Sequence, residues 1–138
     1  MAQVSMSTQV NASSDEVWKR IGGFDGMPDW HPLISRSEAS EGGRVRRLTL
    51  PDGGVVVERL LSFSESDHSY TYAIIGGPIP VANYRATLRV RPQAGQPGSV
   101  VDWASEFEPA GAPEADVVAL IRGVFQAGFD QLGEVFPG

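Results

Sequence analysis

Three residues in this sequence, His31, Glu58 and Tyr84, carry reactive or hydrogen-bonding groups in apolar surroundings. A neutral histidine donates at one ring nitrogen and accepts at the other, and its ordinary pKa of about 6.5 suits proton transfer. A buried carboxyl group has a raised pKa, because burial penalises its charged form. A buried phenol usually finds a hydrogen-bond partner. We therefore consider these three as candidate catalytic residues or as polar contacts to a ligand.

His31 allows three interpretations. It stands between Trp30 and Pro32, so its ring can hydrogen-bond the local backbone and orient the Trp30 loop. It can also supply a polar contact inside a pocket. If it reaches Glu58 across a cavity, the pair could bind a ligand oxygen or transfer a proton. The sequence leaves all three open.

Glu58 belongs to a β-branched run at 55–64, in which Arg59 is its neighbour. Successive side chains of a strand point to opposite faces, so one of these two charges faces the inner side of a sheet. Glu58 is then either a buried acid in a pocket or a rim carboxylate paired with Arg85 or Arg46.

Tyr84 lies on a strand with clear alternation of apolar and polar residues. Parity predicts the inward residues as Ala82, Tyr84, Ala86, Leu88 and Val90 in one strand and Val101, Trp103, Ser105 and Phe107 in another. The Tyr84 hydroxyl then meets Glu58, water, a ligand or only the protein core. Ala86 and Ser105 are small among large neighbours, and this difference in size would open space.

The elements that position these residues begin with a strand at 3–11 and a short helix. The helix begins near Ser13, because Ser13 and Glu16 have capping-box spacing. It ends at Gly22-Gly23, where glycine suits a left-handed backbone. Residues 27–30 can form a second helical turn. Further strands are predicted at 34–39, 44–50, 55–64, 70–75, 81–91 and 100–108.

The last segment has a helical period. From Glu114 onward, apolar residues recur at spacings of three and four, which is typical of one apolar helix face. The stripe contains Val117, Val118, Ile121, Val124, Phe125, Gly128, Phe129, Leu132, Val135 and Phe136. Glycine inside a helix costs about 1 kcal/mol relative to alanine. Gly128 therefore either permits close helix–sheet contact or leaves space for a ligand.

The composition excludes several classes of protein. A net charge of −6 without a basic stretch argues against nucleic-acid binding. No window approaches the roughly 20 apolar residues that span a bilayer. The N-terminal residues do not resemble a signal peptide, so a soluble cytoplasmic protein without membrane insertion is expected.

Metal and cofactor chemistry is not expected. The chain has no cysteine, and its two histidines lie on separate elements without ligand spacing. His68 is predicted to lie in an exposed turn. No nucleotide-binding or hydrolase motif occurs.

These elements predict an α+β fold in a single domain at 1–138. A twisted antiparallel sheet of seven strands is curved, so a straight helix across its concave side cannot touch every position. Side chains or a ligand must fill the remaining space. We therefore expect a seven-stranded curved antiparallel sheet wrapped around a long C-terminal helix, with two short helices after the first strand.

Several segments together resemble the helix-grip superfamily, which includes the major birch pollen allergen, lipid-transfer START domains and bacterial polyketide cyclase/dehydrase-like proteins. The segments are Ser14-Asp15-Glu16-Val17-Trp18, Trp30-His31-Pro32, Val57-Glu58-Arg59-Leu60, Asn83-Tyr84-Arg85-Ala86-Thr87 and the closing helix. The resemblance covers essentially the whole chain, although no segment is a catalytic signature alone. It implies a helix-grip fold with a cavity for a hydrophobic ligand.

The middle of the chain is also similar to plant abscisic acid receptors, which share this fold. Positions that match pocket-lining residues there are Glu58, Tyr72, Tyr84 and Ala86. The loops at 50–54 and 76–80 match the two mobile loops of those receptors. The chain departs from them at His31, where they carry a lysine for the hormone carboxylate, and at Trp103, where they carry a pocket acid. The resemblance thus implies a cavity with two lids but does not support a hormone receptor.

Two functional hypotheses follow. The first is binding of a hydrophobic or amphipathic small molecule, such as a lipid, polyketide or aromatic metabolite, by a monomer or weak homodimer. Its predicted contacts are Trp30, His31, Glu58, Tyr72, Tyr84, Ala86, Trp103, Ser105, Phe107, Ile121, Phe125 and Gly128. The second is a polyketide cyclase/dehydratase-type enzyme, in which His31 with Glu58 or Tyr84 transfers protons. Trp30, Trp103 and Phe107 fit either ligand stacking or an ordinary core.

Overall fold

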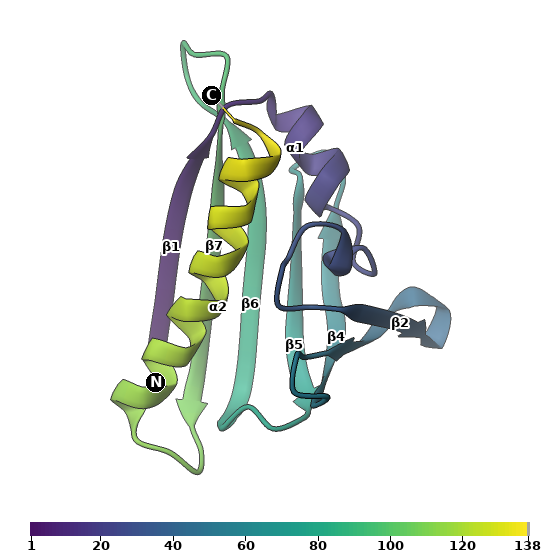
Figure 1. The fold of residues 1–138 in the computed structure, drawn as a ribbon, viewed down its shortest axis with the longest axis vertical. Helices are drawn as coiled ribbons and strands as arrows, with labels where there is room; N and C mark the ends of the chain where they lie inside the picture. The colour runs from purple at the N-terminus through teal and green to yellow at the C-terminus, as the bar shows by residue number, and fades with distance from the viewer. Residues whose placement is uncertain (138) are drawn as a thin grey trace.

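Seven antiparallel strands form one curved sheet, and the long helix α2 lies across its inner face (Figure 1). The computed structural model describes residues 1–137. In chain order the elements are β1 (Ala2–Val10), α1 (Ser14–Ile21), η1 (Met27–Asp29), β2 (Arg36–Ser40), η2 (Glu41–Gly43), β3 (Val45–Thr49), β4 (Val55–Ser64), β5 (Ser69–Gly76), β6 (Val81–Pro92), β7 (Ser99–Pro109) and α2 (Glu114–Val135). The order across the sheet is β1-β7-β6-β5-β4-β3-β2, so β2 to β7 form a meander and β1 pairs with β7. The predicted α+β architecture is confirmed.

The segment between α1 and β2 differs in detail from the prediction. The second helical turn is a single 3-10 turn, η1, after which the His31 backbone N–H donates to the Met27 carbonyl at 2.8 Å. The Ile34 N–H then donates to the His31 carbonyl at 3.2 Å. This turn delays the start of β2 to Arg36, two residues later than predicted.

Helix α1 begins as its sequence predicts, but it ends for a different reason. The Ser13 hydroxyl accepts a hydrogen bond from the Glu16 N–H at 3.2 Å. Gly22, at the other end, has φ −78°, which is an ordinary right-handed value. A Cβ at Gly22 would lie 2.5 Å from the Trp18 ring. Glycine is therefore required there by close packing and not by a left-handed backbone.

The expected exposure of His68 is wrong. His68 does lie in the turn between β4 and β5, but its ring stacks on Trp18 of α1 with 5.3 Å between the ring centroids. Its Nε2 atom is 2.9 Å from a carboxylate oxygen of Asp15. The sequence pattern did not indicate that α1 would cover this turn.

The inner face of the sheet follows strand parity. Its buried residues in β6 and β7 include Tyr84, Ala86, Leu88, Val90, Val101, Trp103, Ser105 and Phe107. Ala82 is the exception and is only half-buried. The pairing of β6 with β7 is irregular between Ala82 and Arg85, and Asn83 there has φ +54°. Alternation therefore predicts the inner face wherever the ladder is regular.

Helix α2 comes very close to the protein interior at Gly128. A Cβ at this position would lie 2.9 Å from the His31 and Trp30 rings and 3.2 Å from the Trp103 ring. Such distances are shorter than normal carbon contacts. Of the two roles considered for Gly128, the structure shows close contact.

We predict that Gly128→Ala lowers the free energy of unfolding by about 1–3 kcal/mol, because overpacking outweighs the gain in helix propensity. Gly123→Ala and Gly133→Ala are matched controls on the same helix, since a Cβ at either meets nothing within 4 Å. These controls should raise stability by up to about 1 kcal/mol. Urea unfolding measures all three. Equal stabilisation by all three substitutions would contradict the close contact.

Candidate functional site

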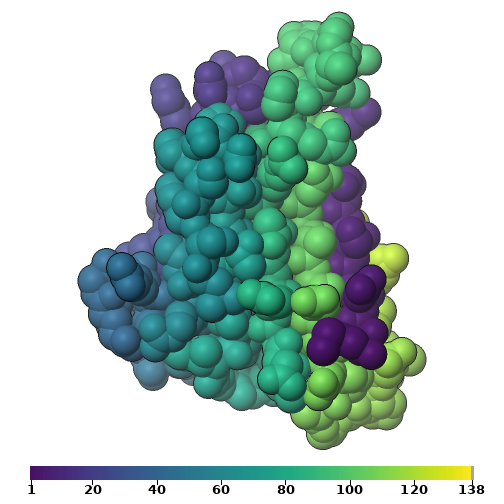
Figure 2. Space-filling model, turned by 180° about the vertical axis from the view of Figure 1, so that it is seen from behind, coloured from purple at the N-terminus to yellow at the C-terminus, as the bar shows by residue number. Residues whose placement is uncertain are grey.

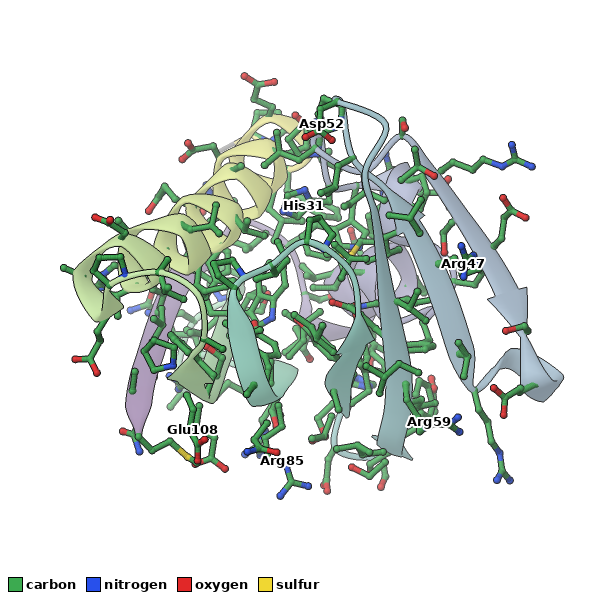
Figure 3. All side chains as sticks on the ribbon, turned by 90° about the horizontal axis from the view of Figure 1, so that it is seen from below. His31, Arg47, Asp52, Arg59, Arg85 and Glu108 are labelled. Carbon is green, nitrogen blue, oxygen red and sulfur yellow. The ribbon has the colours of Figure 1, made fainter. Side chains whose placement is uncertain are left out.

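A small cavity lies between the sheet and α2. Its volume is ≈ 60 Å³. Its lining residues are Met27, Ile34, Leu48, Leu50, Val56, Glu58, Tyr72, Ile74, Ile79, Tyr84, Trp103, Ile121, Val124 and Phe125. Seen from below, side chains fill most of the space between α2 and the sheet (Figure 3).

The predicted ligand contacts divide into two groups around this cavity. The residues that line it are Glu58, Tyr72, Tyr84, Trp103, Ile121 and Phe125. Those outside its lining are Trp30, His31, Ala86, Ser105, Phe107 and Gly128. The structure thus gathers the carboxylate of Glu58 and the phenols of Tyr72 and Tyr84 around one space, without His31.

A larger hollow of ≈ 600 Å³ lies on the opposite, outer face of the sheet, the face seen in Figure 2. Its lining residues are Gln3, Ser5, Leu61, Ser62, Thr71, Arg85, Ala86, Thr87, Ala104, Ser105 and Glu106. Most are small or polar, and the hollow is open to solvent. Ala86 and Ser105 are among the lining residues of this hollow although both are buried members of the inner face, and neither lines the inner cavity.

Glu58 is held by a buried ion pair with Arg46. The two residues are direct partners in the pairing of β3 with β4. Arg46 Nε donates to Glu58 Oε1 at 2.8 Å, and Nη2 lies 2.6 Å from the same oxygen. The Arg46 side chain is fully buried and that of Glu58 is 8% exposed. Within residues 1–137 the hydrogen bonds of this carboxylate engage Oε1 and not Oε2.

Aromatic residues enclose the Arg46 guanidinium on its other sides. Nη1 donates to the Phe24 carbonyl at 2.6 Å and lies 3.4 Å from the Tyr70 hydroxyl. The guanidinium carbon is 4.1 Å from the centre of the Phe24 ring and 4.9 Å from that of Tyr72. Cation–π contacts of this kind stabilise a desolvated cation. Arg46 is therefore sealed behind Glu58 and is not part of the cavity wall.

Burial and charge shift the pKa values of these groups. Burial raises the pKa of Glu58, and the Arg46 guanidinium opposes the shift. Burial lowers the pKa of Arg46, but Tyr70 and Glu58 outweigh that effect and keep the guanidinium charged. Burial, followed by the negative charge of Glu58, raises the pKa of Tyr84. Tyr84 is therefore a neutral phenol at physiological pH.

His31 has a structural environment. Its Nδ1 accepts from the Leu33 backbone N–H at 3.2 Å, so Nε2 carries the proton and donates to the Val124 carbonyl at 2.8 Å. Burial lowers the pKa of His31, and this effect exceeds the opposing one of the Val124 hydrogen bond. The ring is therefore neutral and ties the loop after η1 to helix α2. Of the three interpretations, the geometry matches hydrogen bonding to the backbone.

Aromatic side chains occupy most of the volume that sheet curvature leaves beneath α2. Trp103 stacks on Phe125 with 4.2 Å between ring centroids and lies 5.7 Å from Trp30. Its indole N–H donates to the Tyr72 hydroxyl at 3.0 Å. The stack of Tyr84 on Phe107 extends the cluster, with 5.8 Å between centroids. The small cavity is the space that remains.

Two loops meet at the end of the cavity. The turn between β3 and β4 is closed by the Leu50 N–H, which donates to the Gly54 carbonyl at 2.8 Å. A Cβ on Gly54 would lie 3.6 Å from Pro78 in the β5–β6 loop. Leu50 and Ile79, one from each loop, line the cavity. Figure 3 marks the β3–β4 turn by Asp52.

Arg46 was predicted only as a possible rim partner of Glu58, whereas the structure buries the pair. Phe24 and Tyr70 were not predicted as site residues. Arg46 has the strand parity of the buried Leu48, and this signal was sufficient to predict an inward arginine. Parity likewise predicts that Tyr70 faces the same side as Tyr72. Phe24 lies in a loop, where no periodicity indicates its direction.

Among residues 1–137, no helix has the length and apolar character needed to cross a membrane. The same residues contain no group of three or more histidine, aspartate or glutamate side chains that could hold a metal ion.

Comparison with known proteins gives consistent matches over nearly the whole chain. The family model described as "Polyketide cyclase / dehydrase and lipid transport" matches residues 1–137. The structure of the protein XoxI from Bacillus cereus is 38% identical, with a TM-score of 0.96 over 99% of this chain and 96% of that one. MLP-like protein 423 from Arabidopsis thaliana is 25% identical over 94% of this chain and 90% of its own. A START superfamily protein from Mycobacterium smegmatis, 18% identical, has the same fold, with a TM-score of 0.78 over 97% of this chain and 96% of its own.

We predict that Arg46→Met lowers the free energy of unfolding by about 3–5 kcal/mol, because it leaves the Glu58 carboxylate buried without its partner. The double variant Arg46→Met/Glu58→Leu should recover most of this loss. Arg36→Met is the control, since the Arg36–Glu38 pair is exposed and its loss should cost less than about 1 kcal/mol. Chemical denaturation gives the comparison. If Arg46→Met lowers the free energy of unfolding no more than Arg36→Met does, the buried pair does not stabilise the fold as proposed.

We predict that His31 makes the protein less stable below about pH 6.5, the ordinary pKa of histidine. The folded-state pKa is lowered, so the unfolded chain binds a proton that the folded protein excludes. The free energy of unfolding then falls with decreasing pH by up to about 1.4 kcal/mol per unit. His31→Gln keeps a donor for the Val124 carbonyl but cannot titrate, so its profile between pH 7 and 5 should be flatter. If the free energy of unfolding changes with pH equally in the wild type and in His31→Gln, the prediction is wrong.

Proposed function

The chain belongs to the polyketide cyclase/dehydrase and lipid transport family, and from this premise we propose that it binds a hydrophobic or amphipathic small molecule between the sheet and α2. The observation that carries the proposal is the composition of the cavity wall. Apart from Glu58 and the polar atoms of Tyr72, Tyr84 and Trp103, the lining side chains are apolar. Small-molecule sites have this anatomy, with apolar walls and a few polar groups that fix orientation.

The size of the cavity adds a requirement. Ligand pockets usually enclose about 300–1,000 Å³, and this cavity has ≈ 60 Å³. A ligand with even one ring therefore has to enlarge the space as it binds. The part suited to move is the pair of loops at its end. They are short and meet each other, and each contributes one apolar residue, Leu50 or Ile79, to the wall.

The remaining walls are less suited to move. Trp103, Phe125 and Tyr72 are interlocked by stacking and by an indole–phenol hydrogen bond. The β4 side is fixed by the Arg46–Glu58 pair. Separation of the two loops would open the apolar end while Glu58 and Tyr84 keep their places. The ligand would then lie with its apolar part towards the loops.

The alternative function is a cyclase or dehydratase reaction. It requires a proton carrier at the ligand, and His31 was the predicted one. Both ring nitrogens of His31 are engaged by backbone groups, and the ring is outside the cavity lining. Glu58 and Tyr84 remain as polar groups at the cavity. Their arrangement favours holding a ligand oxygen over transferring protons, so we place binding first.

We predict that the wild-type protein binds the probe 1-aminoanthracene with one saturable site, measured by fluorescence titration. Ile79→Trp places a larger side chain at the cavity end and should raise the Kd by at least about tenfold, or 1.4 kcal/mol. Ile75→Trp is the matched control, because Ile75 is 51% exposed on β5 and does not line the cavity. Absence of saturable binding to the wild type, or equal Kd values for both variants, would refute the proposed site.

A further inference from the structure

We propose that the cavity selects an uncharged ligand that carries a hydroxyl group, and that it rejects carboxylates. This inference rests on the proposed function, because it specifies which ligand the same cavity accepts. It follows from the identity, partners and burial of the polar groups in the wall.

The first observation is the charge of the wall. Glu58 is the charged residue of the wall, held as a carboxylate by its ion pair with Arg46, and the lining contains no lysine, arginine or histidine. A ligand carboxylate inside this cavity would therefore meet a like charge and no cation. In a poorly solvated interior such a contact is much more costly than in water. An apolar molecule with an acidic group, such as a fatty acid, is thus disfavoured.

The second observation is the position of Arg46. Its guanidinium neutralises Glu58, but it lies behind the carboxylate and is enclosed by Phe24, Tyr70 and Tyr72. The side chain is fully buried and is not part of the lining. A ligand anion therefore cannot reach this cation without displacing Glu58. The ion pair presents its negative end to the cavity.

The third observation is the unused bonding capacity of Glu58. Arg46 Nε donates to Oε1 at 2.8 Å, Nη2 lies 2.6 Å from the same atom without a hydrogen bond, and the hydrogen bonds within residues 1–137 leave Oε2 free. A carboxylate oxygen accepts hydrogen bonds and cannot donate them. The group that satisfies Oε2 must therefore be a donor. A hydroxyl group donates without bringing a charge.

The fourth observation is the presence of Tyr84 at the same cavity. Its phenol is neutral, and it lines the same cavity as Glu58. A ligand hydroxyl can donate to Glu58 and accept from the Tyr84 hydroxyl, which uses both of its capacities. A hydrogen bond to a charged group is the stronger of the two. The ligand class is therefore an alcohol or phenol on an apolar framework.

The test uses three ligands of one size, naphthalene, 2-naphthol and 2-naphthoate, which displace 1-aminoanthracene at pH 7. At this pH the phenol is neutral and the acid is ionised. For the wild type we expect 2-naphthol to bind at least about tenfold more tightly than 2-naphthoate and more tightly than naphthalene.

The decisive variant is Glu58→Gln. It removes the negative charge from the wall and leaves Arg46 without its counterion. The affinity for 2-naphthoate should therefore rise at least about tenfold relative to the affinity for 2-naphthol. Naphthalene, which has no polar group, should change little. Glu106→Gln removes the same charge from the outer face of β7 and should leave the preferences of the wild type unchanged. Circular dichroism and a thermal melt establish that each variant is folded.

Each outcome bears on the inference. If naphthalene displaces the probe but 2-naphthol and 2-naphthoate bind the wild type equally, the selectivity is wrong and the proposed binding function stands. If neither the probe nor the three ligands bind, both fail. If Glu58→Gln does not fold, Tyr84→Phe is the second test. It should raise the Kd of 2-naphthol at least about threefold and leave the Kd of naphthalene unchanged. An unchanged 2-naphthol affinity in a folded variant would overturn the inference.

Discussion

The buried ion pair between Arg46 and Glu58 is the interaction on which the inner side of this sheet depends. A charge taken out of water costs several kcal/mol unless its partners replace the lost solvation. Here the partners come from three places: Glu58 on the adjacent strand, the Phe24 carbonyl in the loop after α1, and the Tyr70 hydroxyl on β5. The pair therefore couples the meander to the loop that carries η1, and both contribute to the cavity wall.

The approach of α2 determines how much space the fold retains. Sheet curvature leaves a gap under a straight helix, but Gly128 lets the helix settle onto the Trp30, His31 and Trp103 rings. The aromatic cluster around Trp103 occupies most of what remains. The inner cavity extends toward the loops, where Leu50 and Ile79 line it together with Ile121 and Val124 of α2. A binding function consequently requires that the loop end moves while the ion-pair end stays fixed.

Sequence periodicity predicted the architecture well, because both regular elements have strict geometric periods. Parity placed Tyr84 on the inner face and left open whether Glu58 or Arg59 shares it, and the structure shows that Tyr84 and Glu58 line the cavity. It had no means of predicting that His31 would turn to the Val124 carbonyl, since that contact joins a loop to a helix 93 residues away. The volume of the cavity could not be predicted from the sequence either. It is the small difference between the volume that sheet curvature leaves under α2 and the volume that the aromatic side chains fill.

The sign of the charge in the cavity is a consequence of strand register. Arg46 and Glu58 are direct partners on β3 and β4, and both point inward. A shift of one residue in either strand would turn its charged side chain to the outer face and leave the other one buried alone. The longer arginine side chain extends toward Phe24 and Tyr72, whereas the shorter glutamate ends at the cavity. The same pair that stabilises the sheet thereby places a negative charge at the cavity, so the proposed selectivity depends on the contact that holds β3 to β4.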